Sequence, residues 1–206
     1  MTVLLLIEDH AIVRAGVSRL LSARPDIVIH GMATAEEGLA ALKTITPELI
    51  VLDMNLPGIS GFEALRRFRP AAPGAPILVF SMHSEPVYAV RALECGAKGY
   101  VSKSAPPTEI LLAIDTLLLG ETYVEKEIAR EISTGTSNSG DYLRHLTGRD
   151  LEILRLLASG RTLSEIAQSF GVAYKTVANT CTRTREKLGA RSLAELVSLA
   201  KGLGLT

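Results

Sequence analysis

"LIVLDMNLPGISG", residues 49–61, decides the fold of the first part of the chain. Four apolar residues lead directly into one carboxylate, Asp53, and the chain then turns through Asn55, Pro57 and Gly58. A short apolar run bounded by turn residues is typical of a strand in a sheet that is covered on both faces. A lone charge at the mouth of such a strand is unfavourable without partners. We therefore expect other parts of the chain to supply partners for Asp53.

Strand and helix patterns alternate on both sides of this stretch. Apolar runs at 3–7, 27–32, 76–81 and 99–102 join 49–53 as five predicted strands, and the segments between them carry apolar residues at helical spacing. This alternation predicts an α/β fold with a five-stranded, doubly wound parallel sheet. In such sheets, ligands bind at the carboxyl ends of the strands.

Charge divides the chain into two modules. Residues 1–142 hold 12 Lys and Arg against 17 Asp and Glu, whereas residues 143–206 hold 10 against 5. We expect a first domain at 1–120, a linker at 121–142 that is partly helical and then flexible, and a second domain at 143–206, with the boundary near 137–142. The basic second domain favours a polyanion as its partner.

Composition excludes several classes of protein. The chain lacks an apolar run of the roughly 20 residues that span a bilayer, and its start does not have the pattern of a signal peptide, so we expect a cytoplasmic protein with no membrane partner. Cys95 and Cys181 lie far apart within helical patterns, which favours two reduced structural thiols over a disulfide or a metal site. The four histidines show no metal-binding spacing, and we expect His10 and His83, which border the site loops, to be surface residues.

Acidic residues end two of the predicted strands. Glu8 and Asp9 follow the first strand and Asp53 follows the third, so a parallel sheet would bring them to one edge. Three crowded carboxylates need a counter-charge, and oxygen ligands suit Mg²⁺. Ser81 and Lys103 end the fourth and fifth strands and could bind phosphoryl oxygens. Taken singly, Asp9 could cap a helix, Ser81 could serve a turn and Lys103 could be a solvated charge, but together they favour a site.

With these residues in place, residues 1 to about 120 resemble the receiver domain of two-component response regulators. The resemblance implies strand order 2-1-3-4-5 and Asp53 as the phosphoacceptor. It also implies that Asp9, Asp53 and the backbone carbonyl of Asn55 hold Mg²⁺, with Glu8 acting through water. Lys103 would bind the phosphoryl group, and Ser81 would move towards it and let Tyr100 turn inward. Two departures are Glu8 in place of the commoner Asp and Ser104 in place of the usual proline.

The basic tail has helix-turn-helix spacing. It predicts four short helices, at 149–158, 163–170, 174–188 and 193–200. Steps of 100° put Val177, Cys181, Thr184 and Leu188 on one face of the third helix, and polar residues on the opposite face suit the major groove of DNA. A small surface bundle with solvated charges is the alternative from the pattern alone.

The whole tail is similar to the DNA-binding domain of the NarL/FixJ class, which has a LuxR-type helix-turn-helix. "EIA" at 165–167, "KTV" at 175–177 and "KLG" at 187–189 carry the resemblance. On the polar face of the third helix, we expect DNA contacts from Lys175, Thr176, Asn179, Thr182, Arg183 and Arg185. Ser164 and Thr180 stand where Lys and His are common, so we expect lower non-specific affinity and a weaker salt dependence. The last helix would serve either dimerisation or core packing.

Together, these resemblances imply a phosphorylation-controlled transcription regulator. A sensor histidine kinase, or a small acyl phosphate, would phosphorylate Asp53 with Mg²⁺, and the tail would bind promoter DNA as a homodimer. The unmodified first domain would mask the third tail helix. We expect such a protein not to be an enzyme. Its own reactions would be phosphoryl transfer to Asp53 and later loss of the phosphoryl group from Asp53. One alternative is a phosphorylation-independent DNA-binding regulator. Another is a Mg²⁺-dependent aspartyl phosphatase, but the position of Asp53 after the third strand counts against the phosphatase.

Overall fold

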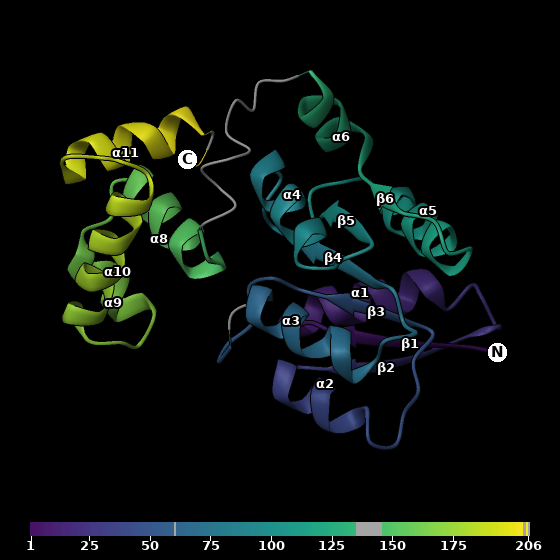
Figure 1. Ribbon diagram of the computed structural model, residues 1–206. Coiled ribbons are helices and arrows are strands. Elements are labelled where there is room, and N and C mark those ends of the chain that lie inside the picture. Colours follow the sequence, from purple (N-terminus) through teal and green to yellow (C-terminus); the bar gives the residue numbers. More distant parts are fainter. Residues whose placement is uncertain (60, 135–145, 204, 206) are drawn as a thin grey trace. The chain divides into compact units, whose positions relative to one another are not determined.

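The computed structural model describes residues 1–59, 61–134, 146–203 and 205. The chain forms two compact units, Met1–Thr134 and Gly135–Thr206 (Figure 1). The boundary expected near 137–142 lies outside the described residues. His145 lies outside them as well. None of the described helices is long and apolar enough to cross a membrane.

The first unit is built on a parallel sheet in the order β2-β1-β3-β4-β5-β6. The strands are β1 (Thr2–Ile7), β2 (Ile27–Met32), β3 (Leu49–Leu52), β4 (Ile77–Ser81), β5 (Gly99–Ser102) and β6 (Tyr123–Val124). The parallel order 2-1-3-4-5 is confirmed for the first five strands. The number of strands is wrong by one, because β6 adds to the edge at β5. Two residues are too few to show a period in the sequence.

Helices cover both faces of this sheet. They are α1 (Ala11–Leu21), α2 (Ala35–Ala41), α3 (Gly61–Ala71), α4 (Pro86–Glu94), α5 (Pro107–Leu118) and α6 (Lys126–Ser133). Side chains of α1 and α5 share one buried cluster with β1, β3, β4 and β5. On the other face, α2 packs so closely that a Cβ at Gly38 would lie 2.8 Å from Phe68 of α3 and 3.0 Å from Ile7. All four residues of β3 are buried, as its apolar run predicts.

Two glycines shape the loop between β3 and α3. Gly58 has a φ of +86°, a left-handed conformation that glycine adopts without steric penalty. A Cβ at Gly61 would lie 2.4 Å from the Cα of Met54, and the Gly61 N–H donates to the Met54 carbonyl. The loop that follows Asp53 therefore needs glycine at both positions in order to return tightly over the strand end.

The second unit consists of four described helices, in agreement with the sequence pattern. They are α8 (Gly148–Ala158), α9 (Leu163–Ser169), α10 (Tyr174–Lys187) and α11 (Leu193–Gly202). Thr147 and Thr162 begin α8 and α9 with reciprocal hydrogen bonds to Asp150 and Glu165, which is the capping box that satisfies otherwise unpaired N–H groups. Cys181 is buried and Cys95 is partly buried, and both are free thiols as expected.

Asp150 joins α8 to α10. Its side chain is buried and accepts hydrogen bonds from Lys187 Nζ at 2.8 Å, Thr184 Oγ1 at 3.0 Å and the Thr147 N–H at 2.7 Å. Burial by itself raises the pKa of Asp150, but the hydrogen bonds from Lys187, Thr147 and Thr184 outweigh it and hold the pKa below its usual value. The ionised carboxylate is therefore the form that holds these helices together.

Replacing Asp150 with Asn is expected to lower the free energy of unfolding of the second unit by about 1–3 kcal/mol, because charged hydrogen bonds are removed from a buried site. Because the folded pKa is lowered, the contribution of Asp150 is full above its unfolded pKa of about 3.9 and disappears as the pH falls through the folded value. Denaturant titration of the full chain between neutral and acidic pH measures both effects. Glu186→Gln, an exposed acid on α10, is the control, and equal stability of the two variants would refute this role of Asp150.

Candidate phosphoacceptor site and nucleic-acid interface

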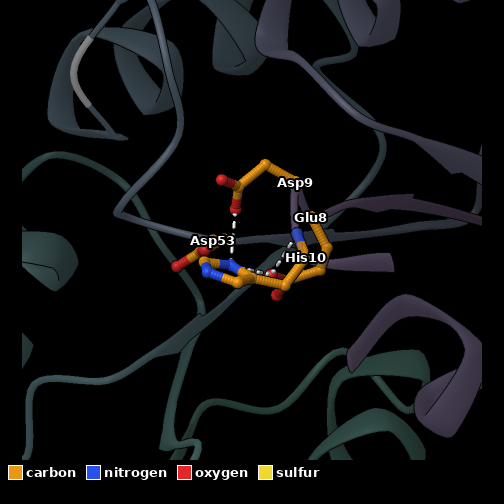
Figure 2. Close-up of side chains that lie close together, drawn as sticks. All are labelled: Glu8, Asp9, His10 and Asp53. Carbon is orange, nitrogen blue, oxygen red and sulfur yellow. Dashed lines mark hydrogen bonds and ion pairs between the residues drawn. The ribbon is translucent and has the colours of Figure 1, made fainter. Parts of the chain in front are cut away.

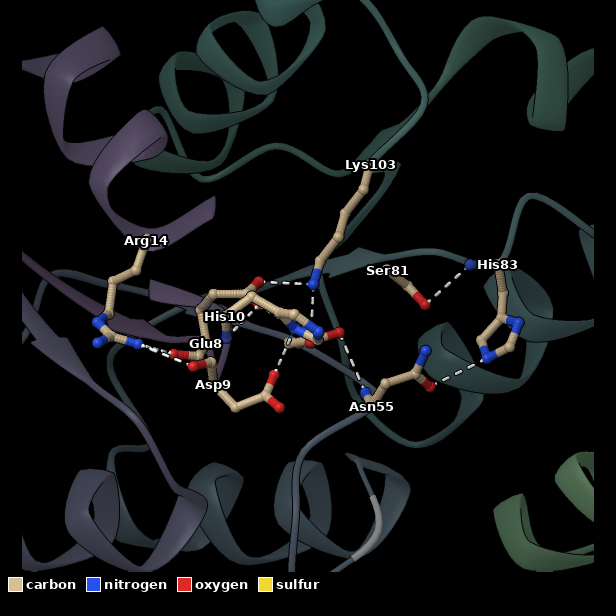
Figure 3. Close-up of polar contacts among 9 residues, drawn as sticks. Glu8, Asp9, His10, Arg14, Asn55, Ser81, His83 and Lys103 are labelled. Carbon is tan, nitrogen blue, oxygen red and sulfur yellow. Dashed lines mark hydrogen bonds and ion pairs between the residues drawn. The ribbon is translucent and has the colours of Figure 1, made fainter. Parts of the chain in front are cut away.

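The ends of four strands meet at one edge of the sheet. Glu8 and Asp9 follow β1, Asp53 follows β3, Ser81 ends β4 and Lys103 follows β5. Backbone hydrogen bonds align these ends, from Asp53 N–H to the Ile7 carbonyl at 2.9 Å and from Lys103 N–H to the Ser81 carbonyl at 2.7 Å. The structure therefore brings these strand ends together as a parallel sheet predicts: Lys103 contacts both Glu8 and Asp53, and Figure 3 shows Glu8, Asp9, Ser81 and Lys103 around the same region.

Lys103 lies between two buried carboxylates. Its Nζ is 2.7 Å from Asp53 Oδ2 and 2.6 Å from Glu8 Oε2. The side chains of Lys103, Glu8 and Asp53 are 5%, 1% and 0% exposed, so this is a desolvated ion cluster rather than a surface contact. A buried charge of this kind persists only when it is paired and hydrogen-bonded. Each of the three residues therefore depends on the others.

Asp9 and His10 are the more exposed members of the cluster that Figure 2 shows. His10 Nδ1 is 2.8 Å from Asp9 Oδ1 and 3.2 Å from Glu8 Oε1, and the His10 side chain is 64% exposed, as expected for a surface residue. Asp9 does not cap α1, because the capping position is His10. One ligand atom from each of Glu8, Asp9, His10 and Asp53 lies within 4.8 Å of the others. This grouping could hold a metal ion, and His10 was not among the predicted metal ligands.

Arg14 is a further contact that the sequence pattern did not predict. From α1, its guanidinium donates to the backbone carbonyls of Glu8 and Asp9 (Figure 3). In the sequence, Arg14 lies one helical turn after His10, and this spacing could have indicated that its side chain reaches back to the end of β1. The contact fixes the backbone that carries both acids.

Asn55 and His83 connect the loops that follow β3 and β4. The Asn55 N–H donates to Asp53 Oδ1 at 3.1 Å, and Asn55 Oδ1 lies 3.1 Å from His83 Nε2. The prediction that His83 is a surface residue is wrong, because its ring is buried and stacks on Tyr88 of α4 with centroids 4.1 Å apart. Spacing did not reveal this stack, since it is a tertiary contact between a loop and a helix.

Ser81 and Tyr100 are both fully buried around the same histidine. Ser81 Oγ accepts the His83 N–H at 3.2 Å, and the Tyr100 hydroxyl donates to the His83 carbonyl at 2.8 Å. Burial raises the pKa of Tyr100, so the phenol is held as a neutral donor. We expected Tyr100 to turn inward when Ser81 moves. The structure shows Tyr100 in this inward position.

In the second unit, α10 has the predicted two faces. Val177, Cys181 and Thr184 are buried and Leu188 is partly buried, whereas the opposite face exposes Lys175, Thr176, Asn179, Thr182 and Arg183, with Arg185 half-buried. Thr176, Asn179, Thr182, Arg183 and Glu186 line a shallow hollow of about 470 Å³. Glu186 and the exposed ring of Tyr174 were not among the predicted contacts.

Thr180, which stands where His is common in the family, is buried in the structure. Its hydroxyl donates to the Thr176 carbonyl at 2.9 Å, inside α10. A threonine hydroxyl can reach the carbonyl one helical turn before it, so the polar group of Thr180 is satisfied within its own helix.

Comparison with known proteins identifies both units. Residues 4–115 match the response regulator receiver domain, and residues 144–200 match the luxR family of bacterial regulatory proteins. The chain is 36% identical over 197 residues to the methanol utilization control regulatory protein MoxX of Paracoccus denitrificans, an alignment that covers 94% of this chain and 88% of that protein. It is 35% identical over 207 residues to the transcriptional activator protein ExaE of Pseudomonas putida, covering 98% and 97%.

Solved structures share the fold. A LuxR-family two-component response regulator from Aurantimonas is 39% identical, with a TM-score of 0.61 over 65% of this chain and 97% of that one. A solved complex of the response regulator RcsB with DNA is 21% identical, with a TM-score of 0.63 over 98% of both chains, and shows a common fold. The chain belongs to the two-component response regulators that combine a receiver domain with a LuxR-type helix-turn-helix domain.

Proposed function

We propose that this chain regulates transcription through phosphorylation of Asp53 by a sensor histidine kinase. The observation that carries the proposal is the buried cluster of Lys103 with Asp53 and Glu8 at the carboxyl ends of the strands. The receiver and LuxR-type families support a phosphorylation-controlled, DNA-binding regulator rather than a classical enzyme. Phosphoryl transfer to Asp53 and subsequent loss of the group are the reactions that we assign to the chain itself.

The acidic side of the cluster fits Mg²⁺. Glu8, Asp9 and Asp53 offer carboxylate oxygens within 4.8 Å of one another, and hard oxygen donors are the ligands that Mg²⁺ prefers. We assign Asp9, Asp53 and the Asn55 carbonyl as direct ligands and Glu8 as a partner through water. When bound, the ion would offset the negative charge that gathers around the phosphoryl oxygens.

The chain's own residues would perform the transfer as follows. A carboxylate oxygen of Asp53 forms the new O–P bond while the P–N bond of the donor phosphohistidine breaks, and its electron pair stays on the imidazole nitrogen. Lys103, now 2.7 Å from Asp53, would neutralise a phosphoryl oxygen. Ser81 would hydrogen-bond another oxygen, and His83 would carry that change to Tyr100, because it contacts both side chains through its backbone.

DNA binding is assigned to the exposed face of α10. Lys175, Arg183 and Arg185 supply charge for phosphates or guanine, and Asn179 supplies an amide that can pair with adenine. The last helix, α11, exposes Leu193 and Leu199, which supports its use in a homodimer on promoter DNA. Phosphorylation would replace the single carboxylate charge of Asp53 with a phosphoryl group that carries roughly −1.5 to −2 charges, and it would shift the balance of receiver conformations towards the DNA-binding form.

Incubation of the full chain with Mg²⁺ and acetyl phosphate is expected to add one phosphoryl group to wild type and none to Asp53→Asn. Intact mass detects the adduct. The affinity for a DNA duplex that the protein selects from a random pool shows the effect of the adduct on DNA binding. Wild type is expected to bind more tightly after phosphorylation, whereas Asp53→Asn should not change. An adduct on the variant, or equal DNA binding in all states, would contradict the proposal.

Replacing Lys103 with Met is expected to destabilise the first unit by about 3–5 kcal/mol without a divalent cation, because two buried carboxylates are deprived of their counter-charge. Mg²⁺ should restore part of this stability, and more of it than Mg²⁺ adds to wild type. Thermal unfolding with and without Mg²⁺ measures the difference. Lys98→Met, an exposed lysine at the opposite end of β5, is the control and should respond as wild type does.

Replacing Lys175 or Arg183 with Ala is expected to weaken DNA binding and to lower the slope of log K against log salt by about 0.9 for each DNA phosphate that the variant no longer neutralises. Fluorescence anisotropy across a salt series measures both quantities. Lys201→Ala removes an equal charge from an exposed site on α11. If Lys201→Ala changed the slope as much as the α10 variants, the binding face would lie elsewhere.

A further inference from the structure

Glu125 is a buried acid that the function proposed above does not use. It follows β6 directly and has an exposed fraction of only 8%. Its Oε2 accepts the N–H of Ser102 at 2.8 Å, and its own N–H donates to the Tyr100 carbonyl at 3.0 Å. One residue therefore binds the backbone of β5 at two points, once through its side chain and once through its main chain.

The two contacts lie on the part of β5 that serves the phosphoacceptor site. Tyr100 is the residue whose hydroxyl donates to the His83 carbonyl. Ser102 immediately precedes Lys103, whose Nζ contacts Asp53 and Glu8. A displacement of Lys103 or Tyr100 would thus displace the backbone groups to which Glu125 is bonded.

On its other side, Glu125 begins α6. Its carbonyl accepts the Ala129 N–H at 2.9 Å, the first hydrogen bond of that helix. The helix packs against α4 (Figure 1), and its Ile128 is buried. It ends at Ser133, one residue before the end of the first unit, so the chain leaves the receiver through α6.

Glu125 occupies this place against an electrostatic penalty. Burial raises the pKa of Glu125, and the nearby carboxylates of Glu109 and Glu127 raise it further, whereas the hydrogen bond from Ser102 lowers it. An acid at an exposed position would avoid this burial, and Glu127, two residues later, is exposed. The Ser102 hydrogen bond is therefore the specific interaction that favours the buried position.

We propose that Glu125 is a positioning residue that fixes the end of β5 beside Lys103 and, through the same contact, couples phosphorylation of Asp53 to α6. The inference rests on the proposed function, since it requires a phosphoryl group on Asp53. It adds a defined connection between that site and the segment that leads to the DNA-binding unit. The contact depends on the length of the side chain and on its acceptor oxygen.

Two conservative variants of the full chain separate length from charge. Glu125→Gln keeps the length and an acceptor oxygen, whereas Glu125→Asp keeps the charge but is one methylene too short to reach the Ser102 N–H. Each is treated with Mg²⁺ and acetyl phosphate, occupancy is matched by intact mass, and hydrogen exchange of residues 126–133 is followed by peptide mass spectrometry. Glu127→Asp is the matched control, because Glu127 is exposed on the same helix.

Phosphorylation is expected to change exchange in α6 in wild type, Glu125→Gln and Glu127→Asp, and this change should disappear in Glu125→Asp at equal occupancy. If Glu125→Asp kept the full change in exchange, or if phosphorylated wild type showed no change, the role of Glu125 would be overturned. The proposed function would not be affected by either result. Failure of wild type to form the adduct would instead overturn the proposed function and this inference with it.

Discussion

Desolvated negative charge at one edge of a parallel sheet needs a cation, and Lys103 supplies it. Glu8 and Asp53 are almost completely buried, yet each lies within 2.7 Å of the same ammonium group. This contact requires β1, β3, β4 and β5 to be adjacent and their ends to be level. The strand order is therefore part of the chemistry, because a different order would leave buried carboxylates without a counter-charge.

The sequence was sufficient for much of this unit because its strongest signals are long or repeated. Continuous apolar runs predicted five strands, and the rule that parallel strands end together placed Asp9, Asp53, Ser81 and Lys103 at one edge. The two residues of β6 carry too little pattern to predict a strand. The buried position of His83 depends on its stack with Tyr88, which is a tertiary contact without a fixed spacing.

Helical periodicity was similarly informative in the second unit, where 100° steps separated the buried and exposed faces of α10. It did not reveal that Asp150 accepts hydrogen bonds from two residues of α10, because those partners lie more than 30 positions away. Periodicity assigns a face to a residue, but the partner of a buried polar group is decided by packing.

The short β6 strand has a practical consequence for how the receiver can be isolated. The edge of a sheet presents unpaired N–H and C=O groups that another chain can bind. Here Tyr123 and Glu125 bond to those groups along β5, from the Lys98 carbonyl to the Ser102 N–H. A receiver truncated at residue 120, where the sequence pattern weakens, would leave β5 open as a template for self-association. A fragment that ends after α6 would keep this edge closed.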